Sequence, residues 1–207
     1  MLDQSQRTHI LSGGKTSIAW EGEPLLGSSY GEEEIEAAVA AMRSAMNVSA
    51  GFGFTCAEIL AFENAFAEYV GVKHAIAINS AGPGLDMAMR YLRLDPGDEV
   101  IVPAINFVAS PLAIYGAGGK VVWGEVDPVT LQLDPADVAR KLTPRTRALL
   151  PVHMNGLAAP MDDLLEAVQQ HPHPKHGPIT IIGDAARACG GKYKGVPIGK
   201  HGFANVF

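Results

Sequence analysis

The sequence has few of the features that mark secreted, membrane or nucleic-acid-binding proteins. It contains only two cysteines, Cys56 and Cys189, which lie far apart in the chain and form no metal-binding pair. No apolar run approaches the roughly 20 residues that span a bilayer, and the N-terminus lacks the charged-then-apolar order of a signal peptide. Basic residues are scattered and the formal net charge is −6, which excludes a nucleic-acid-binding stripe. We therefore expect a cytoplasmic protein with reduced thiols and no membrane or nucleic-acid partner.

The composition is that of a well-packed α/β protein. Of its 207 residues, 47% are hydrophobic and 18% are charged. Capping boxes at Ser29-x-x-Glu32 and Thr55-x-x-Glu58 open the first two helices, and Gly71 is a typical helix stop. Further on, helical patterns alternate with short apolar runs that predict strands at 75–79, 99–102, 120–126, 147–152, 179–183 and 205–207. This alternation predicts a three-layer α/β/α fold with a mainly parallel sheet.

In such open sheets, ligands bind beyond the carboxyl ends of the strands. The turn Ser80-Ala-Gly-Pro-Gly84 lies between a predicted strand and a predicted helix. Its small residues would expose backbone N–H groups at a helix N-terminus, which is a ready site for a phosphate. A plain tight turn is the alternative interpretation of the same residues.

Asp184 follows the run Ile179-Thr-Ile-Ile-Gly183, so its carboxylate should be buried at a strand end and needs a partner. The partner could be a helix N-terminus, Arg187, or the protonated ring nitrogen of a cofactor that acts as an electron sink. Phe107 could stack on a flat ring or belong to the core. His153, after another strand, is more typical of a hydrogen-bonded structural histidine.

In combination and in order, these segments resemble the DegT/DnrJ/EryC1/StrS family of sugar aminotransferases. The resemblance runs from about Tyr30 to the end of the chain. The motifs that carry it are Glu63-x-x-Phe66-Ala-x-Tyr69-x-Gly71, Pro96-Gly-Asp-Glu-Val-Ile-Val-Pro103, Asp127-Pro-x-Thr130, Pro151-Val-His153, Asp184-Ala-Ala186 and Tyr193-x-Gly195-x-x-Ile198-Gly199.

The resemblance implies fold type I, the aspartate-aminotransferase-like fold, with pyridoxal 5′-phosphate (PLP) as cofactor. It implies that Asp184 pairs with the pyridine nitrogen and that Phe107 stacks on the ring. Ser80, Ala81 and Gly82 fall on the family's Ser-Gly-Thr phosphate turn. It also implies a small-molecule keto-sugar substrate, usually nucleotide-linked, an amino donor of the glutamate type, and a homodimer.

Three departures from the family pattern affect the expected site. The family's Ser-Gly-Thr turn reads Ser80-Ala-Gly82 here, so a threonine hydroxyl to the phosphate is lost while the backbone donors can remain. Arg187 stands where the family usually has glutamine or histidine near the ring hydroxyl. Its guanidinium could hold the ring oxygen as an anion, or it could pair with Asp184. The sequence ends at Phe207, before the family's Schiff-base lysine, so we expect that this chain alone does not transaminate.

The expected domain organisation follows from the same resemblance. Residues 1–55 would form an N-terminal segment and first helix, and residues 56–207 an incomplete PLP-binding large domain, with the C-terminal small domain absent. Two other functions stay open: a pyridoxamine phosphate (PMP)-dependent sugar dehydratase of the same family, and a non-catalytic truncated product. His171, His173 and His176 are best interpreted as parts of a polar loop, and no metal is expected.

Overall fold

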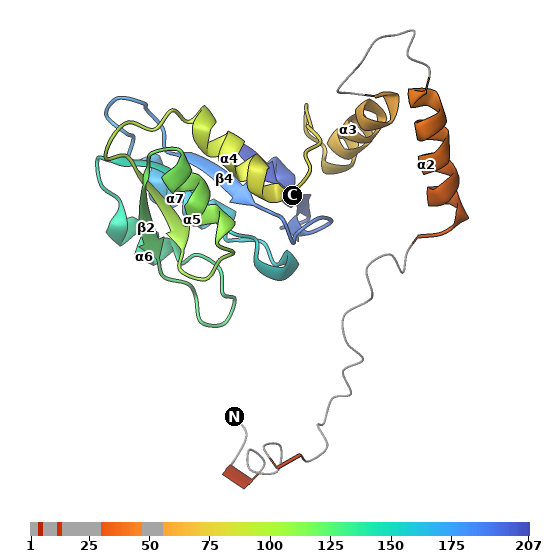
Figure 1. Ribbon diagram of the computed structural model, residues 1–207. Helices are drawn as coiled ribbons and strands as arrows, with labels where there is room; N and C mark the ends of the chain where they lie inside the picture. The colour runs from red at the N-terminus through yellow and green to blue at the C-terminus, as the bar shows by residue number, and fades with distance from the viewer. Residues whose placement is uncertain (1–3, 6–11, 14–29, 47–55) are drawn as a thin grey trace. The chain divides into compact units, whose positions relative to one another are not determined.

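The chain divides into two compact units, residues 1–54 and 55–207. In a computed structural model (Figure 1), the structure describes residues 4–5, 12–13, 30–46 and 56–207. The described part of the first unit includes helix α2 (Glu32–Ala45), whose N-cap residue is Gly31. Ser29 and Thr55, from the two predicted capping boxes, lie outside the described residues. The backbone N–H of Gly31 donates to a carboxylate oxygen of Glu34 at 2.6 Å, so an acidic side chain satisfies the first turn of α2.

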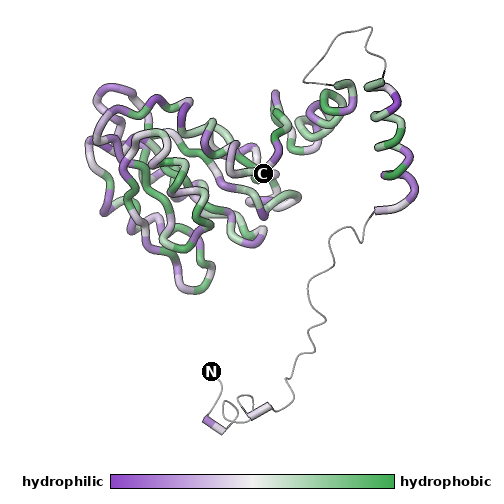
Figure 2. Tube along the Cα trace, in the orientation of Figure 1, coloured by the Kyte–Doolittle hydropathy of each residue, from purple (hydrophilic) through white to green (hydrophobic). Residues whose placement is uncertain are grey.

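The second unit is built on a five-stranded parallel sheet with the order β2-β1-β3-β4-β7. Its strands are β1 (Glu99–Pro103), β2 (Lys120–Gly124), β3 (Thr146–Leu149), β4 (Thr180–Asp184) and β7 (Ala204–Val206). A two-stranded antiparallel hairpin, β5 (Lys192–Tyr193) and β6 (Val196–Pro197), follows β4. Hydrophobic residues run along the strands and hydrophilic ones gather in the outer loops (Figure 2). The predicted mainly parallel sheet is confirmed.

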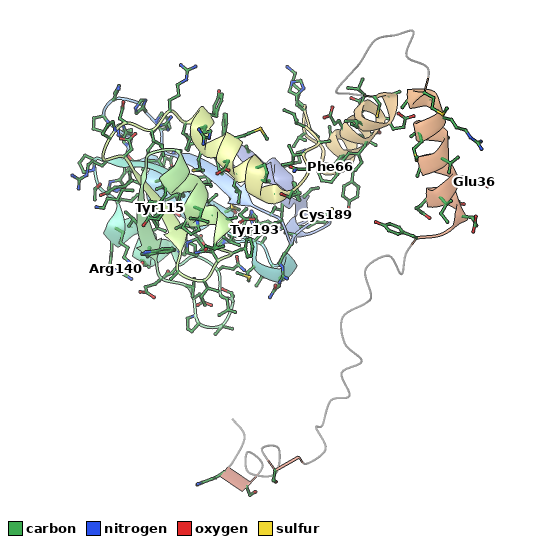
Figure 3. All side chains as sticks on the ribbon, viewed as in Figure 1. Glu36, Phe66, Tyr115, Arg140, Cys189 and Tyr193 are labelled. Atoms are coloured by element: carbon green, nitrogen blue, oxygen red, sulfur yellow. The ribbon has the colours of Figure 1, made fainter. Side chains whose placement is uncertain are left out.

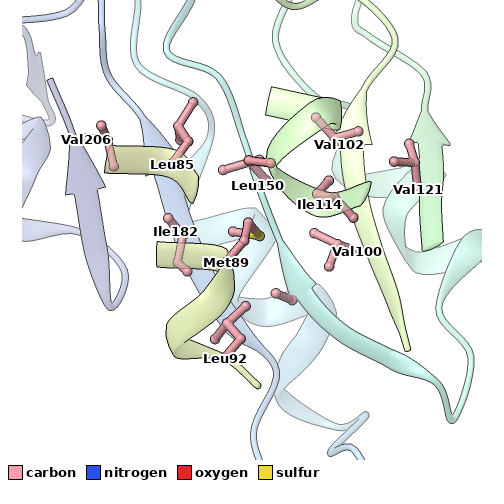
Figure 4. Close-up of a cluster of buried hydrophobic side chains, with 12 residues drawn as sticks. Leu85, Met89, Leu92, Val100, Val102, Ile114, Val121, Leu150, Ile182 and Val206 are labelled. Atoms are coloured by element: carbon pink, nitrogen blue, oxygen red, sulfur yellow. The ribbon is translucent and has the colours of Figure 1, made fainter. Parts of the chain in front are cut away.

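Helices cover both faces of this sheet because successive strand residues point to opposite sides. Val100 and Val102 of β1 join one hydrophobic core, while Ile101 between them joins another. The first core also contains residues of α4 (Ala81–Tyr91) and α5 (Ala109–Gly116), as Figure 4 shows. The second contains residues of α6 (Pro135–Lys141) and α7 (Met161–Gln169). This arrangement confirms the three-layer α/β/α architecture.

Helix α3 (Ala57–Val70) opens the second unit, and its N-cap residue is Cys56. It ends at Gly71, which has a left-handed φ of 78°, so the predicted helix stop is confirmed. The ring of Phe66, labelled in Figure 3, packs edge-on against Phe207 with ring centroids 5.3 Å apart. None of the described helices is both long and apolar enough to cross a membrane.

The predicted strand at 75–79 is wrong. The segment has no strand partner in the described part of the chain, and Ile76 is 79% exposed. The N–H of Ala77 donates instead to a carboxylate oxygen of Glu63 in α3, at 2.8 Å. An apolar run sets the local periodicity, but a strand forms only where a neighbouring backbone accepts and donates its hydrogen bonds.

Candidate active site

The carboxyl ends of the parallel strands meet at one edge of the sheet, and Asp184 is the last residue of β4. Val206 of β7 lies opposite Asp184 in the strand register. Val206 also packs against the first turn of α4, where a Cβ added to Gly84 would lie 2.7 Å from Val206 Cγ1. The N-terminus of α4 and the Asp184 carboxylate therefore share the same edge of the sheet.

Within the described residues, the N-terminus of α4 has hydrogen-bond donors without a partner. Ser80 is its N-cap residue in an extended conformation, and the Ser80 hydroxyl makes no capping hydrogen bond. The N–H groups of Ala81 and Gly82 belong to the first turn, which no intrahelical carbonyl satisfies. A Cβ added at Gly82 would meet only the Ser80 hydroxyl within 4 Å in the described structure. One hydroxyl, two N–H groups and the positive end of the helix dipole form a donor set that fits a phosphate.

Asp184 is buried, with 5% of its surface exposed. Its Oδ2 accepts a hydrogen bond from the hydroxyl of Ser110 at 2.7 Å, and its Oδ1 accepts a longer one from the N–H of Ala186 at 3.2 Å. Its backbone is fixed on both sides, because its N–H donates to Pro151 O and its C=O accepts from His153 N–H, each at 2.9 Å. A rigid strand end thus presents this carboxylate.

Ser110 is a site residue that the sequence analysis missed. It lies at the start of α5 and is fully buried. Its one signal in the sequence is its setting: between Phe107 and Ala117 there is no other serine and no charged residue, and the stretch is mainly apolar. A buried hydroxyl in such a stretch needs a partner, although the sequence does not name it.

Phe107 lies just before α5, and Ser110 lies in the first turn of that helix. The N–H of Ser110 donates to the carbonyl of Phe107 at 3.1 Å. The Phe107 side chain is 72% exposed, so it is not part of the core and its ring is accessible to a ligand. This segment therefore links an accessible aromatic ring to the buried carboxylate of Asp184.

Arg187 does not pair with Asp184. Its guanidinium donates to the side-chain oxygen of Asn155 at 3.2 Å, and both residues are exposed. Asn155 has a left-handed φ of 52° within the short 3₁₀ turn η2 (Met154–Gly156). Of the two roles left open for Arg187, the ion pair with Asp184 is therefore not the one that the structure shows.

His153 is 1% exposed, and its Nδ1 accepts a hydrogen bond from the N–H of Ala159 at 3.0 Å. This confirms the expected structural histidine. Burial lowers the pKa of His153 to about 4, against the opposing effects of Asn205 and Asp184. In the described structure its Nε2 and the side-chain oxygen of Asn205 both lack a hydrogen bond of good geometry, and both lie against Gly183.

The histidine loop lies at the opposite, amino-terminal edge of the sheet. His176 Nε2 and Lys175 Nζ contact the Asp95 carboxylate at 2.8 and 2.6 Å, and His173 Nε2 lies 3.3 Å from Asp98. These contacts tie the loop to the turn before β1. The ligand atoms of Asp95, Asp98 and His176 come within 4.8 Å of one another, but Lys175 already neutralises Asp95.

A cavity of about 180 Å³ is lined by residues of α3 and the segment after β4, including Val70, Gly191, Ile198 and Phe207. None of the predicted cofactor-binding residues lines it. The site is therefore identified by its donor and acceptor groups rather than by a cavity.

The parallel sheet, the open helix N-terminus and the buried carboxylate at one edge define an α/β protein of the aspartate-aminotransferase-like class, fold type I. Beyond that class, the chain belongs to the DegT/DnrJ/EryC1/StrS aminotransferase family, whose model matches residues 29–207.

Curated relatives support the assignment. The chain is 40% identical over 149 residues to GDP-perosamine synthase of Caulobacter vibrioides, covering 72% of this chain and 38% of the relative. It is 43% identical over 142 residues to dTDP-3-amino-3,4,6-trideoxy-alpha-D-glucose transaminase of Streptomyces venezuelae, covering 69% and 36%. The chain thus spans less than two-fifths of the length of these relatives.

Solved structures agree. DesV of S. venezuelae matches with a TM-score of 0.69 and 40% identity over 81% of this chain and 43% of that one. Spr1654 of Streptococcus pneumoniae, solved in its PLP form, matches with a TM-score of 0.76 and 28% identity over 84% and 45%. A GDP-4-keto-6-deoxymannose-3-dehydratase, at 23% identity and a TM-score of 0.76, covers 89% of this chain and 46% of its own; it shares the fold alone.

Proposed function

We propose that residues 56–207 form the PLP-binding part of an aminotransferase that transfers an amino group from a glutamate-type donor to a nucleotide-linked keto-sugar. Residues 1–55 are assigned to a separate N-terminal segment. The observation that carries the proposal is the buried Asp184 carboxylate at the carboxyl end of β4. The two donors that Asp184 receives, the Ser110 hydroxyl and the Ala186 N–H, are both neutral, and a protonated pyridine nitrogen would supply the positive charge that a buried carboxylate favours.

The residues present fit the cofactor. Ser80, Ala81 and Gly82 would hold the phosphate through one hydroxyl and two N–H groups at the N-terminus of α4. Phe107 would cover one face of the ring, and Asp184 would accept the ring N–H. When bound, PLP supplies an electron sink for the carbon that loses or gains the amino group.

The chain's own residues bind and orient this group. Asp184 keeps the ring nitrogen protonated because a nearby negative charge favours the cationic form. Arg187, held by Asn155 rather than by Asp184, remains available to the ring oxygen. In this proposal Arg187 favours the anionic form of that oxygen, in place of a neutral hydrogen-bond donor.

The substrate and partners are inferred from the relatives, whose names include a GDP-sugar synthase and a dTDP-sugar transaminase. A homodimer is proposed because the family resemblance implies one. A cytoplasmic location is supported by Cys56 and Cys189, which are both exposed and free of disulfides.

Titration of the 207-residue protein with PMP tests the cofactor site, because PMP cannot form imines with surface lysines. We expect saturable binding that Asp184→Asn weakens by about tenfold or more, the effect of a lost hydrogen bond between charged groups. Asp163→Asn, which removes an exposed carboxylate on α7, is the matched control and should leave binding unchanged. Equal binding by wild type and Asp184→Asn would refute the proposed site.

The substrate assignment has a separate test. The protein that carries this chain is incubated with glutamate and GDP- or dTDP-linked keto-sugars, and amino-sugar formation is followed by mass spectrometry. Amino transfer to sugars without a nucleotide, and not to the nucleotide-linked ones, would refute this part of the proposal.

A further inference from the structure

Asp184 has two carboxylate oxygens in different environments. Oδ2 receives the Ser110 hydroxyl at 2.7 Å, which is the short distance of a charge-assisted hydrogen bond. Among the described residues, Oδ1 receives the Ala186 N–H alone, at 3.2 Å. Each carboxylate oxygen can accept about two hydrogen bonds and receives one here, but the bond to Oδ1 is 0.5 Å longer, so Oδ1 is the less strongly held of the two.

The hydroxyl of Ser110 is committed to this one contact. Ser110 is fully buried, and its single O–H proton has the Asp184 carboxylate as its acceptor. The contact joins α5 to β4 across 74 residues of sequence. Because the backbone of Asp184 is also fixed by Pro151 and His153, the hydroxyl removes the remaining freedom, which is rotation of the carboxylate about its side-chain bonds.

We propose that Ser110 is a positioning residue that fixes Asp184 Oδ2 and thereby aims Oδ1 at the pyridine nitrogen of the cofactor. The inference rests on the proposed function. Phe107 lies just before α5, and its carbonyl accepts the Ser110 N–H at 3.1 Å. Residues at the start of α5 would therefore both cover the ring and hold the carboxylate that contacts its nitrogen.

The competing explanation is purely structural. A buried serine must place its hydroxyl somewhere, and Asp184 is a convenient acceptor. In that case, replacing Ser110 lowers the stability of the fold. It also weakens the binding of every ligand at this edge by the same factor, whether or not the ligand has a ring nitrogen. The two explanations differ in whether the effect of Ser110 depends on that nitrogen atom.

The test compares PMP with 1-deaza-PMP, in which a C–H group replaces the ring nitrogen, by calorimetric titration of the 207-residue protein. Wild type should prefer PMP. Ser110→Ala should reduce the ratio of the two dissociation constants by about tenfold, and Ser110→Thr, which keeps the hydroxyl, should restore it. Thr146→Val removes another fully buried hydroxyl, at the amino-terminal start of β3, and should leave the ratio unchanged.

The outcomes separate the two proposals. If wild type binds both ligands equally, or neither, Asp184 does not recognise the ring nitrogen, and the proposed function fails together with this inference. If wild type prefers PMP and Ser110→Ala keeps the full preference while weakening both ligands alike, the inference alone is overturned. If Ser110→Ala does not fold, as judged by thermal denaturation, Ser110→Cys replaces it, because a thiol of similar volume donates only weakly.

Discussion

The stability of the second unit should depend on pH through His153. This histidine is 1% exposed, and burial lowers its pKa from 6.5 to about 4. The unfolded chain therefore binds a proton on His153 between these values while the folded chain does not. Stability from the neutral side chain is fully present above pH 6.5 and is lost as the pH falls toward 4. The pKa difference amounts to ~3 kcal/mol in total, of which about 2 kcal/mol is lost between pH 7 and pH 5.

The assay is urea denaturation at several pH values between 5 and 7, for wild type and for His153→Asn. Asparagine cannot gain a proton, and its side-chain oxygen can replace Nδ1 as the acceptor for Ala159 N–H. We expect the free energy of unfolding of wild type to fall by about 2 kcal/mol more than that of the variant as the pH falls from 7 to 5.

Other groups titrate in the same range, so the difference between the two proteins is the informative quantity. His171→Asn, at an exposed histidine, is the matched control and should leave the wild-type pH dependence unchanged. Identical pH dependence in wild type and His153→Asn would refute the reasoning. An NMR titration in which the His153 ring gains its proton near pH 6.5 would also refute it, because burial would then not lower the pKa of His153.

Three further predictions concern packing and buried charge. Gly84→Ala should destabilise the protein by ~1–3 kcal/mol in urea denaturation, because the new Cβ would overlap Ile78 and Val206, whereas Gly82→Ala has open space and should be near neutral. Asp137→Asn should cost ~2–4 kcal/mol in the same assay, since Asp137 is 4% exposed and partly neutralises two cations; no loss would show that the charge is not needed. Met89→Ala should cost ~2–5 kcal/mol as a cavity in the core, and Met87→Ala, at an exposed position of α4, under ~1 kcal/mol; equal losses would contradict the packing.

Much of the fold can be predicted because its main signal is local. In β1 the residues Val100, Ile101 and Val102 are all apolar, which is typical of a strand covered on both faces, and the structure sends them alternately into two cores. The segment 75–79 carries a similar signal and is not a strand. Its Ala77 N–H is used by Glu63, so the apolar pattern alone did not determine the pairing. Pairing depends on which backbone lies alongside, and no single-strand pattern contains that information.

The candidate site shows the same difference between local signals, which the sequence contains, and long-range contacts, which it does not. Asp184 could be predicted as a functional candidate from the local sequence alone. The six residues from Ile179 to Asp184 form an apolar run that ends in an acid, and burying a charge is costly. Its partner could not be predicted. The sequence left a helix N-terminus, Arg187 and a cofactor's ring nitrogen open as partners, while the fold supplied Ser110, a neutral hydroxyl 74 residues away on another element. A neutral donor satisfies one oxygen without cancelling the negative charge, so Asp184 keeps the property that a pyridinium partner requires. With Ser110 rather than Arg187 as its partner, Asp184 keeps the uncompensated charge that the proposed cationic ligand requires.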